Sequence, residues 1–274
     1  MSSSITFTQA ADSYIEHGGE PRFLQLVRDR FGPEPVDLIS PMAVRKAAEE
    51  AYPQAAPATR NRQFLTPARA VLYHAHEMGW RIPARIRPFR APKMRAVVPA
   101  NRRWLERFLE QCDEDDLPHL AACVLFMNRT GARVSEAVAL QGQNVDLARR
   151  TALLVKTKTE FNSLRFMPDD LIERIRTLDP APGLPVFRYT SRFSVNERIK
   201  AVCARARIPY KSSHVAGRHA FATNALNAGI NVRVAMDAGG WKSSVIFLET
   251  YAHSVEAGRV VMDRLNALAW QDQL

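Results

Sequence analysis

The sequence has few of the features that mark secreted or membrane-spanning proteins. Its three cysteines, Cys112, Cys123 and Cys203, are odd in number and show neither CxxC nor metal-ligand spacing. This pattern favours reduced thiols that pack in a core over a disulfide framework. The longest apolar run, Leu120–Met127, is too short to cross a bilayer, and the first residues do not form a signal peptide. We therefore expect a soluble, intracellular protein.

The sequence also lacks the motifs of nucleotide-driven and metal-driven enzymes. It contains no GxxxxGK[ST] loop and no set of carboxylates spaced to hold a divalent cation. It shows no internal repeat and no low-complexity tract. Its 274 residues, 46% of them hydrophobic, suffice for one large domain or two ordinary ones with buried cores. We expect no cofactor and no metal.

The positive charge of the chain is concentrated in one segment. The formal net charge is +10, and residues 60–103 hold eleven basic residues against the single acid Glu77, whereas the rest of the chain is formally neutral. Such a stripe suits neutralisation of a phosphate backbone, and on charge alone a solvated charged face accounts for it equally well. The residues that we assign to DNA binding are Arg60, Arg62, Arg69, Arg85, Arg87, Arg90, Lys93 and Arg95.

Apolar residues recur at helical intervals on both sides of a proline-rich segment. Residues 5–80 predict a bundle of about four helices, with Ser40 and Pro41 as a cap and first-turn residue. Pro67 lies inside the last of these helices, which is therefore expected to start near Thr66 or to bend there. Four prolines between residues 83 and 99 then interrupt regular structure. We divide the chain into a helical domain, residues 1–82, a basic linker, 83–99, and a second domain, 100–274.

The second domain is expected to be mostly helical with one small sheet. Residues 101–112 and 117–131 predict two helices, the second so apolar that it must be buried. Around residues 144–146, 151–156 and 163–167 the pattern predicts a three-stranded antiparallel sheet. The fold class is therefore mainly α with a small antiparallel β-sheet, in two domains.

The second domain also carries groups suited to breaking a phosphodiester without a metal. That chemistry requires charge stabilisation on the nonbridging oxygens, a nucleophile, and an acid for the leaving hydroxyl. Arg133, in TGARVSE, and Arg218, in GRHAFAT, present planar forks of donors that match a phosphate. Either arginine alone is more often a surface residue, but the two motifs together favour a clamp on the transition state.

Tyr251 is the candidate nucleophile. It closes the stretch GGWKSSVIFLETY, ten residues after Trp241. A phenol with an ordinary pKa of about 10 needs cationic neighbours or a base before it attacks at neutral pH, and His214 and the arginines would supply these. A tyrosine on a helix is more commonly an amphipathic core residue. The spacing after GGWKSS favours the catalytic role.

These motifs together resemble the tyrosine recombinases, also called the phage integrase family. TGxRxSE, followed by RHxFAT and by a GW pair with a later tyrosine, is a specific combination, and the resemblance covers residues 95–255. It implies an N-terminal core-binding domain and a C-terminal catalytic domain that form a C-shaped clamp around double-stranded DNA. It further implies a homotetramer on two specific sites, exchange through a Holliday junction, and 3′ phosphotyrosyl intermediates. Accessory DNA-bending proteins would be further partners.

The resemblance also assigns supporting roles. It makes Lys158 the general acid for the departing 5′ oxygen in preference to Lys156, which would share its strand face. Both are otherwise ordinary exposed lysines. Glu136, three residues after Arg133 on one helix face, would orient that arginine or the histidine. Trp241 would either hydrogen-bond the phosphate through its indole N–H or belong to the core.

Two intervals depart from the family arrangement. The interval from Trp241 to Tyr251, ten positions, is slightly longer than is usual in the family. The family arrangement around the second arginine is His-x-x-Arg. Here a valine occupies that histidine position, and His214 lies one residue farther from Arg218. Gly217 is the residue that would absorb the extra one. His219 and His253 are expected to be structural histidines that satisfy backbone or side-chain partners.

The leading interpretation is a site-specific DNA recombinase that integrates, excises or resolves DNA without metal or ATP. A type IB topoisomerase would use similar chemistry to relax supercoils. A non-catalytic DNA-binding relative is disfavoured because all the reactive side chains are present. We expect the protein in the cytoplasm, associated with the nucleoid or host DNA.

Overall fold

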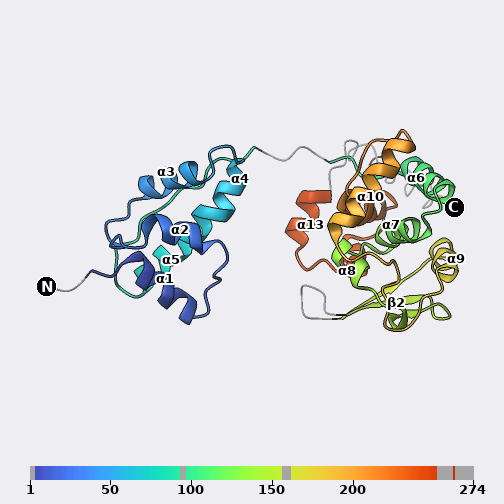
Figure 1. The fold of residues 1–274 in the computed structure, drawn as a ribbon, viewed down its shortest axis with the longest axis horizontal. Coiled ribbons are helices and arrows are strands. Elements are labelled where there is room, and N and C mark those ends of the chain that lie inside the picture. Colours follow the sequence, from blue (N-terminus) through green and yellow to red (C-terminus); the bar gives the residue numbers. More distant parts are fainter. Residues whose placement is uncertain (1–3, 93–96, 156–161, 252–261, 263–274) are drawn as a thin grey trace. The chain divides into compact units, whose positions relative to one another are not determined.

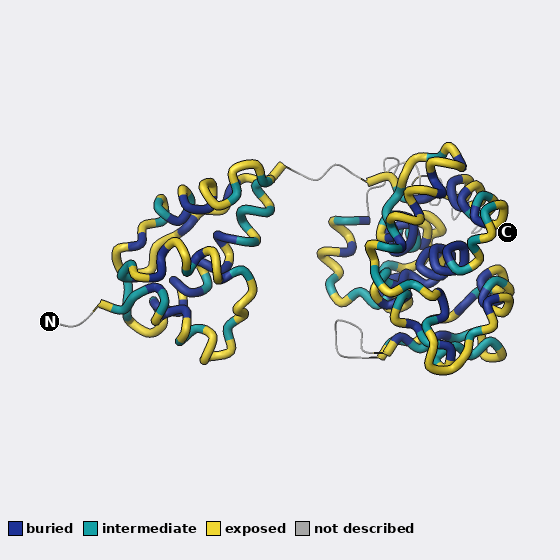
Figure 2. Tube along the Cα trace, in the orientation of Figure 1, coloured by how far each residue is buried: buried dark blue, intermediate teal, exposed yellow. Residues whose placement is uncertain are grey.

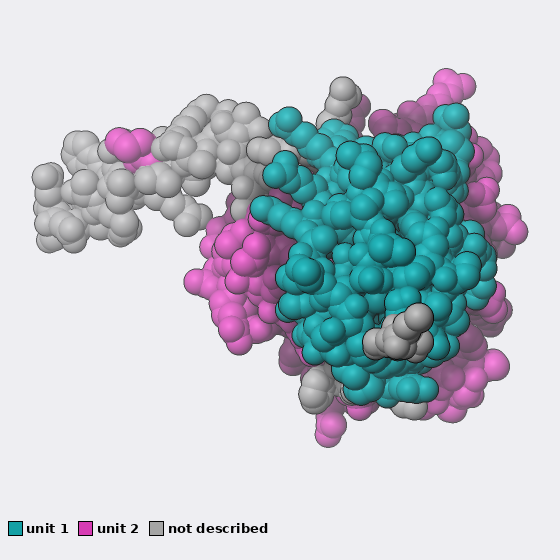
Figure 3. All heavy atoms as spheres, turned by 90° about the vertical axis from the view of Figure 1, so that its left-hand side faces the viewer, with its two compact units in different colours: residues 1–94 teal, residues 95–274 magenta. Residues whose placement is uncertain are grey.

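The structure, a computed structural model, describes residues 4–92, 97–155, 162–251 and 262. The chain forms two compact units, residues 1–94 and 95–274, which Figure 3 shows in different colours. Buried residues gather inside each unit (Figure 2), so each has its own hydrophobic core. Most elements are helices, and one small sheet is present (Figure 1), which confirms the expected fold class. No described helix has the length and apolar character that a bilayer crossing requires.

The first unit is a small helical bundle. Its elements are α1 (Phe7–Glu16), α2 (Leu24–Phe31), α3 (Pro41–Ala51), α4 (Pro57–Arg60), the π-helical turn η1 (Asn61–Leu65) and α5 (Thr66–Glu77). As expected, Ser40 caps α3: its hydroxyl accepts a hydrogen bond from the backbone N–H of Ala43 at 3.1 Å. The buried rings of Phe7, Phe31 and Phe64 follow one another through the core, with centroids 6.2 and 6.4 Å apart.

A change of helix type precedes Pro67. This proline lies in the first turn of α5, directly after the π-helical turn η1. In a regular helix the proline ring crowds the carbonyl four residues earlier and removes a hydrogen bond. The wider turn of η1, in which residue i bonds to i+5, gives that carbonyl more room. As expected, the helix that contains this proline starts at Thr66, and α5 follows directly on the π-helical turn.

The first unit extends into the segment expected to be a linker. Ile86 and Phe89 are buried in its core, 4% and 9% exposed. The side-chain amide of Asn61 donates to the carbonyl of Phe89 at 2.8 Å, and its side-chain oxygen accepts from the backbone N–H of Phe89 at 2.8 Å. The guanidinium of Arg45 lies 4.2 Å from the centroid of the same ring. The proline-rich stretch therefore runs along the first unit at least as far as Phe89.

The second unit is built around one buried helix. Its elements are α6 (Arg102–Glu114), α7 (Pro118–Thr130), α8 (Val134–Ala139), the 3₁₀ turn η2 (Gly142–Asn144), β1 (Val145–Asp146), β2 (Thr151–Leu154), β3 (Ser163–Phe166), α9 (Asp169–Thr177), α10 (Arg192–Arg205), the π-helical turn η3 (Val215–His219), α11 (Ala220–Asn227), α12 (Val232–Gly239) and α13 (Ser244–Tyr251). Helix α7 is apolar around most of its circumference, and α6, α9 and η3 pack against it. The sequence prediction that this helix is buried is confirmed.

The sheet has the order β1-β2-β3 with antiparallel neighbours. Ala152 of β2 pairs with Arg165 of β3. Residues directly opposite each other in an antiparallel pair point to the same face. Ala152 is fully buried, and Arg165 is only 2% exposed. The sheet therefore directs an arginine side chain into the interior of the second unit.

Candidate active site

Arg133 is the N-cap residue that precedes helix α8, and it is hydrogen-bonded to Glu136. Gly131, at φ +68°, ends α7 in the left-handed region that favours glycine, and the chain then turns into α8. Nη1 of Arg133 donates to Oε1 of Glu136 at 2.6 Å, and the backbone N–H of Arg133 donates to Oε2 at 2.8 Å. The glutamate is 8% exposed. Two charge-assisted bonds therefore fix the orientation of Arg133 at the start of the helix.

His214 directly precedes the π-helical turn η3, which carries Arg218 and His219. The turn packs so closely on α7 that a Cβ at Gly217 would lie 2.4 Å from Cβ of Met127. A regular helix brings residues three and four apart onto one face, whereas a π turn bonds residue i to i+5. The wider turn brings His214 and His219 together, with ring centroids 6.4 Å apart. The extra residue between the histidine and the arginine is accommodated in this turn.

Arg218 is buried and donates to three backbone carbonyls. The residue is 3% exposed. Nη1 donates to the carbonyl of Gly131 at 2.7 Å and to that of Gly239 at 2.6 Å, and Nη2 donates to the carbonyl of Gly240 at 3.3 Å. These acceptors lie at the ends of α7 and α12, so one guanidinium joins the two helix termini. The positive charge also matches the negative ends of the helix dipoles.

The surroundings of Arg218 lower the pKa of its guanidinium. Burial and then the positive charge of Arg133 lower the pKa of Arg218 to about 9, while Glu136 acts in the opposite direction. The guanidinium is therefore charged at neutral pH but poorly solvated. An anion placed beside it would restore the lost electrostatic stabilisation.

Tyr251, at the end of α13, is enclosed by aromatic rings. The residue is 7% exposed. The centroid of its ring lies 4.9 Å from that of His219, 5.1 Å from that of Phe247 and 5.6 Å from that of Trp241. Trp241 in turn lies over Arg218, whose Cζ is 3.5 Å from the indole centroid. The phenol and the buried guanidinium are thus separated by one aromatic ring at most.

Both arginines of the site affect the pKa of the Tyr251 phenol. Burial raises its pKa, while Arg218, the side chain of Trp241 and Arg133 act in the opposite direction. The neutral phenol therefore predominates at neutral pH, and the cations favour its deprotonated form.

His214 lies at the edge of this cluster. Burial of the imidazole lowers the pKa of His214, and the neighbouring His219, Arg218 and Arg133 lower it further. The neutral form, which can accept a proton, is therefore favoured at neutral pH. The structure thus brings together Arg133, Glu136, His214, Arg218, Trp241 and Tyr251.

The sequence of the second unit matches a known family. The model described as the phage integrase family matches residues 102–257, which is more than half of the chain. The chain belongs to the phage integrase family of tyrosine recombinases. A curated relative, the integrase of Salmonella phage P22, is 26% identical over 190 residues, which cover 60% of this chain. The match spans 47% of that relative's length.

Solved structures of recombinases share the fold. The integrase of the transposon Tn1549, in complex with a circular intermediate DNA, matches with a TM-score of 0.74 at 18% identity, over 96% of this chain and all of that one. The XerH site-specific recombinase bound to its difH substrate matches with a TM-score of 0.60 at 15% identity, over 92% of this chain and 76% of that one. XerA recombinase matches with a TM-score of 0.53 at 19% identity, over 94% and 97% of the two chains.

Arg165 is a buried arginine near the site that was not predicted from the sequence of this integrase family member. Arg165 donates through Nη1 to the carbonyl of Ala238 and through Nη2 to that of Gly239 at 3.1 Å, and its buried Nε has no acceptor among the described residues. It lowers the pKa of Arg218, with which it shares the Gly239 carbonyl. The sequence places Arg165 in a predicted strand, but the pairing with Ala152 of β2 is needed to show that its side chain points inward. Arginine side chains are mostly exposed in proteins, so the sequence alone does not predict that this one is buried.

Some candidates of this family site fall outside the described residues. They are Lys156, Lys158, Lys93, Arg95 and His253. Among the residues that are described, no group of His, Cys, Asp or Glu side chains is arranged to hold a metal ion. Cys112, Cys123 and Cys203 are buried and unpaired, and burial raises the pKa of the first two to about 12.

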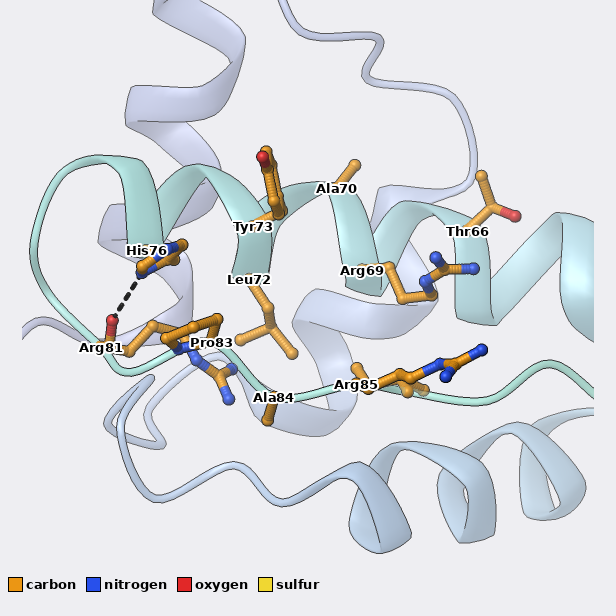
Figure 4. A pocket seen from close by; sticks show the side chains of 11 residues that line it. Thr66, Arg69, Ala70, Leu72, Tyr73, His76, Arg81, Pro83, Ala84 and Arg85 are labelled. Atoms are coloured by element: carbon orange, nitrogen blue, oxygen red, sulfur yellow. Dashed lines mark hydrogen bonds between the residues drawn. The ribbon is translucent and has the colours of Figure 1, made fainter.

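The first unit carries a basic groove of about 670 Å³ along α5. Arg69, from α5, and Arg85, from the segment that follows, line it and extend in the same direction (Figure 4). Both are exposed. Arg81 lies deeper, with Nη1 buried and without a hydrogen-bond partner among the described residues, and burial lowers its pKa. Tyr73, at 62% exposure, adds an aromatic edge.

The other basic residues assigned to DNA binding differ in exposure and in hydrogen bonding. Arg62, Arg87 and Arg90 are exposed. Arg60 instead donates through Nε to the carbonyl of Tyr52 at 2.9 Å and through Nη2 to that of Pro53 at 2.6 Å. The guanidinium of Arg60 thus stabilises the fold of the first unit by bonding two backbone carbonyls.

Proposed function

We propose that this chain is a site-specific DNA recombinase that cleaves and rejoins DNA through a 3′ phosphotyrosyl intermediate, without metal or ATP. The observation that supports the proposal most directly is geometric: Trp241 lies against both Arg218 and Tyr251, with its indole centroid 3.5 Å from Cζ of Arg218 and 5.6 Å from the centroid of the Tyr251 ring. Burial raises the pKa of Tyr251, and Arg218 and Arg133 act to lower it, which favours the deprotonated phenol. Fixed guanidinium groups beside an enclosed phenol form a preorganised site for the charge that develops on an attacked phosphate. The family membership supports the same chemistry.

In the cleavage step, the phenol oxygen of Tyr251 bonds to phosphorus and the bond from phosphorus to the 5′ oxygen breaks. The phenolic proton passes to a base, for which neutral His214 is the candidate. The departing 5′ oxygen gains a proton from Lys158, with the lysine two residues earlier as the alternative. Arg133 and Arg218 bind the nonbridging oxygens through charge-assisted hydrogen bonds.

Rejoining is the reverse of cleavage. The phosphotyrosyl ester retains the energy of the broken phosphodiester, so a 5′ hydroxyl can attack it without ATP. When that hydroxyl belongs to another duplex, strands are exchanged and DNA is integrated, excised or resolved. In this proposal the first unit is the core DNA-binding domain, the second is the catalytic domain, and a homotetramer, with or without DNA-bending proteins, assembles on two specific sites.

The electrostatics of the proposed DNA interface favour phosphate binding by the first unit. The exposed Arg69 and Arg85 line one groove along α5, and the partly unsatisfied Arg81 lines the same groove. Cations of this kind bind the sugar-phosphate backbone without reading the base sequence. The groove in Figure 4 is therefore proposed to hold a DNA strand by its phosphates.

The test is a covalent adduct with DNA. Protein is incubated with random-sequence duplex DNA in the presence of EDTA, denatured in SDS, and assayed for protein that carries DNA. We expect an adduct with the wild type and with Tyr189→Phe, a half-buried tyrosine of the same unit, and none with Tyr251→Phe. Sequencing the trapped DNA then identifies the preferred site.

Three results would oppose the proposal. An adduct that survives in Tyr251→Phe would remove the nucleophile, and an adduct that forms only with a divalent metal would remove the metal-free mechanism. Trapped DNA without any sequence preference, together with relaxation of a supercoiled plasmid, would instead favour a type IB topoisomerase.

A further inference from the structure

His219 lies inside the proposed site, yet none of the cleavage steps uses it. The residue is 7% exposed. On one side, Nε2 of its imidazole is 3.1 Å from the carbonyl oxygen of Val97. On another, its ring meets the ring of Tyr251 edge to face, with centroids 4.9 Å apart and planes at 70°. One imidazole thus contacts both the backbone that enters the second unit and the candidate nucleophile.

The bond to Val97 fixes the orientation of the imidazole. A carbonyl oxygen accepts and never donates, so Nε2 of His219 carries the proton and donates it. A histidine that donates from one ring nitrogen to a backbone carbonyl has its ring plane and tautomer set by that bond. The edge that His219 presents to Tyr251 is therefore determined by the position of the Val97 backbone.

The three rings around Tyr251 are not equivalent. Phe247 lies four residues earlier on the same helix, so it moves with Tyr251 if α13 moves. Trp241 precedes α13 and is held by its contact with Arg218. His219 comes from the π-helical turn η3, which packs on the buried helix α7. It is therefore a wall whose position does not depend on α13.

We propose that His219 is a positioning residue for Tyr251: its imidazole, anchored on the Val97 carbonyl, forms a fixed wall that holds the phenol in line for attack on phosphorus. The inference rests on the proposed function, in which Tyr251 is the nucleophile. The π-helical turn is what allows this arrangement, because it places His219 beside Tyr251 while its neighbour Arg218 reaches the carbonyls at the ends of α7 and α12. An aligned nucleophile gains rate, and small displacements are costly.

Two substitutions separate the contact of the His219 ring with Tyr251 from its hydrogen bond to the Val97 carbonyl. His219→Gln keeps an N–H donor near the position of Nε2 but removes the ring. His219→Phe keeps a ring of similar size but removes the donor. The matched control is His119→Phe, because His119 of the same unit also hydrogen-bonds a backbone carbonyl, with Nδ1 3.3 Å from that of Val186, and it does not contact the site.

Two readouts are compared for each variant. The first is the rate of adduct formation at saturating random-sequence duplex DNA, with the DNA concentration that gives half of that rate. The second needs no DNA: the protein is labelled with 3-fluorotyrosine, and the fluorine NMR signal of Tyr251 is assigned among the six tyrosines by its loss in Tyr251→Phe. If His219 only filled space, His219→Phe would change the stability of the protein but neither the rate of adduct formation nor the fluorine signal of Tyr251.

We expect both His219 variants to lower the saturating rate by about tenfold to a hundredfold. The half-saturating DNA concentration should stay unchanged, and the fluorine signal of Tyr251 should shift. His119→Phe should change neither the rate nor the signal. A wild-type rate and an unshifted signal in His219→Phe would overturn the anchored wall.

The two proposals fail separately. If Tyr251→Phe still forms an adduct, or if the wild type forms none, the proposed function falls. The fluorine signals of the DNA-free variants still decide whether His219 positions the phenol.

Discussion

Arginines occupy opposite surroundings in the two units. In the first, Arg69 and Arg85 are exposed and line an open groove. In the second, Arg165 and Arg218 are 2% and 3% exposed and donate to backbone carbonyls. Exposed cations give attraction that salt screens, whereas buried, fixed cations exert a strong local field. In the proposed function, holding DNA and reacting with it are therefore tasks of different arginines.

The buried arginines are tolerated because of how they are satisfied. Burying a guanidinium is costly unless it is paired and hydrogen-bonded. Here most partners are carbonyls at the ends of α7 and α12, which bring partial negative charge without a full counter-ion. Glu136 is the carboxylate hydrogen-bonded to Arg133, and its negative charge also acts to raise the pKa of Arg165 and of Arg218, which burial lowers. The described site therefore keeps an excess of positive charge for a phosphate.

The largest effect is expected from a matched pair of arginine-to-lysine substitutions. Arg218→Lys removes the fork that joins three carbonyls and that is proposed to bind the phosphate, so adduct formation should fall by about a hundredfold to a thousandfold. Arg69→Lys keeps a mobile exposed charge and should leave the rate nearly unchanged. DNA affinity should change little in either. Equal effects of the two substitutions would erase the distinction between the units.

Arg165→Lys tests whether the second buried arginine supports the first. A lysine replaces the two separate Nη donors of Arg165 with one ammonium nitrogen, so its bonds to the carbonyls of Ala238 and Gly239 should be weaker. The turn after α12, whose carbonyls also accept from Arg218, should then be less stable. We expect a loss of about 1–3 kcal/mol in the free energy of unfolding and a smaller loss of adduct rate than in Arg218→Lys. Urea unfolding and the adduct assay measure the two quantities. An unchanged stability would show that the turn does not depend on Arg165.

Charge reversal in the basic segment should act on affinity alone. The triple variant Arg85→Glu, Arg87→Glu and Arg90→Glu should weaken DNA binding and lower the slope of log affinity against log salt by about 0.9 for each phosphate that the protein no longer neutralises. Arg22→Glu, in the same unit but outside the segment, serves as the control. Binding titrations at several salt concentrations give the slope. A triple variant with the wild-type slope would remove the basic segment from the DNA interface.

The smallest expected effect is a dependence of stability on pH through His214. Burial and the nearby cations lower the pKa of His214 in the folded state. The folded protein therefore binds fewer protons than the unfolded chain, whose histidine has a pKa of about 6.5. The contribution of His214 to stability is complete above that pH and is lost as the pH falls below it. His214→Gln should flatten the acid side of the stability curve measured by urea unfolding; parallel curves would contradict the lowered pKa.

Local patterns in the sequence predicted most of the fold. Ser40 before Pro41 indicated a helix start, and the apolar run from Leu120 indicated a buried helix, because caps and periodicity act over a few residues. The three strands were predicted from alternation in the same way. The packing of Ile86 and Phe89 on the first unit was not predicted, since a proline-rich segment has no periodicity and its burial depends on Asn61 and Arg45 far away in the chain.

The site was predicted in part because its motifs are specific. TGAR, GRHAFAT and the tyrosine after GGW pointed to residues that the structure brings together. The π-helical turn at Val215–His219 was not predicted, because a single inserted residue looks the same whether it forms a loop or widens a helix. Arg165 was missed for a related reason: only the pairing with Ala152 shows that its side chain points inward.

The most direct test of the account is the identity of the residue that carries DNA in the adduct. The adduct is trimmed with nuclease, digested with trypsin and analysed by mass spectrometry. Cleavage after Lys242 and Arg259 releases the peptide SSVIFLETYAHSVEAGR, in which Tyr251 is the only tyrosine. We predict a nucleotide joined through its 3′ phosphate to Tyr251. A nucleotide on any other residue would contradict the account.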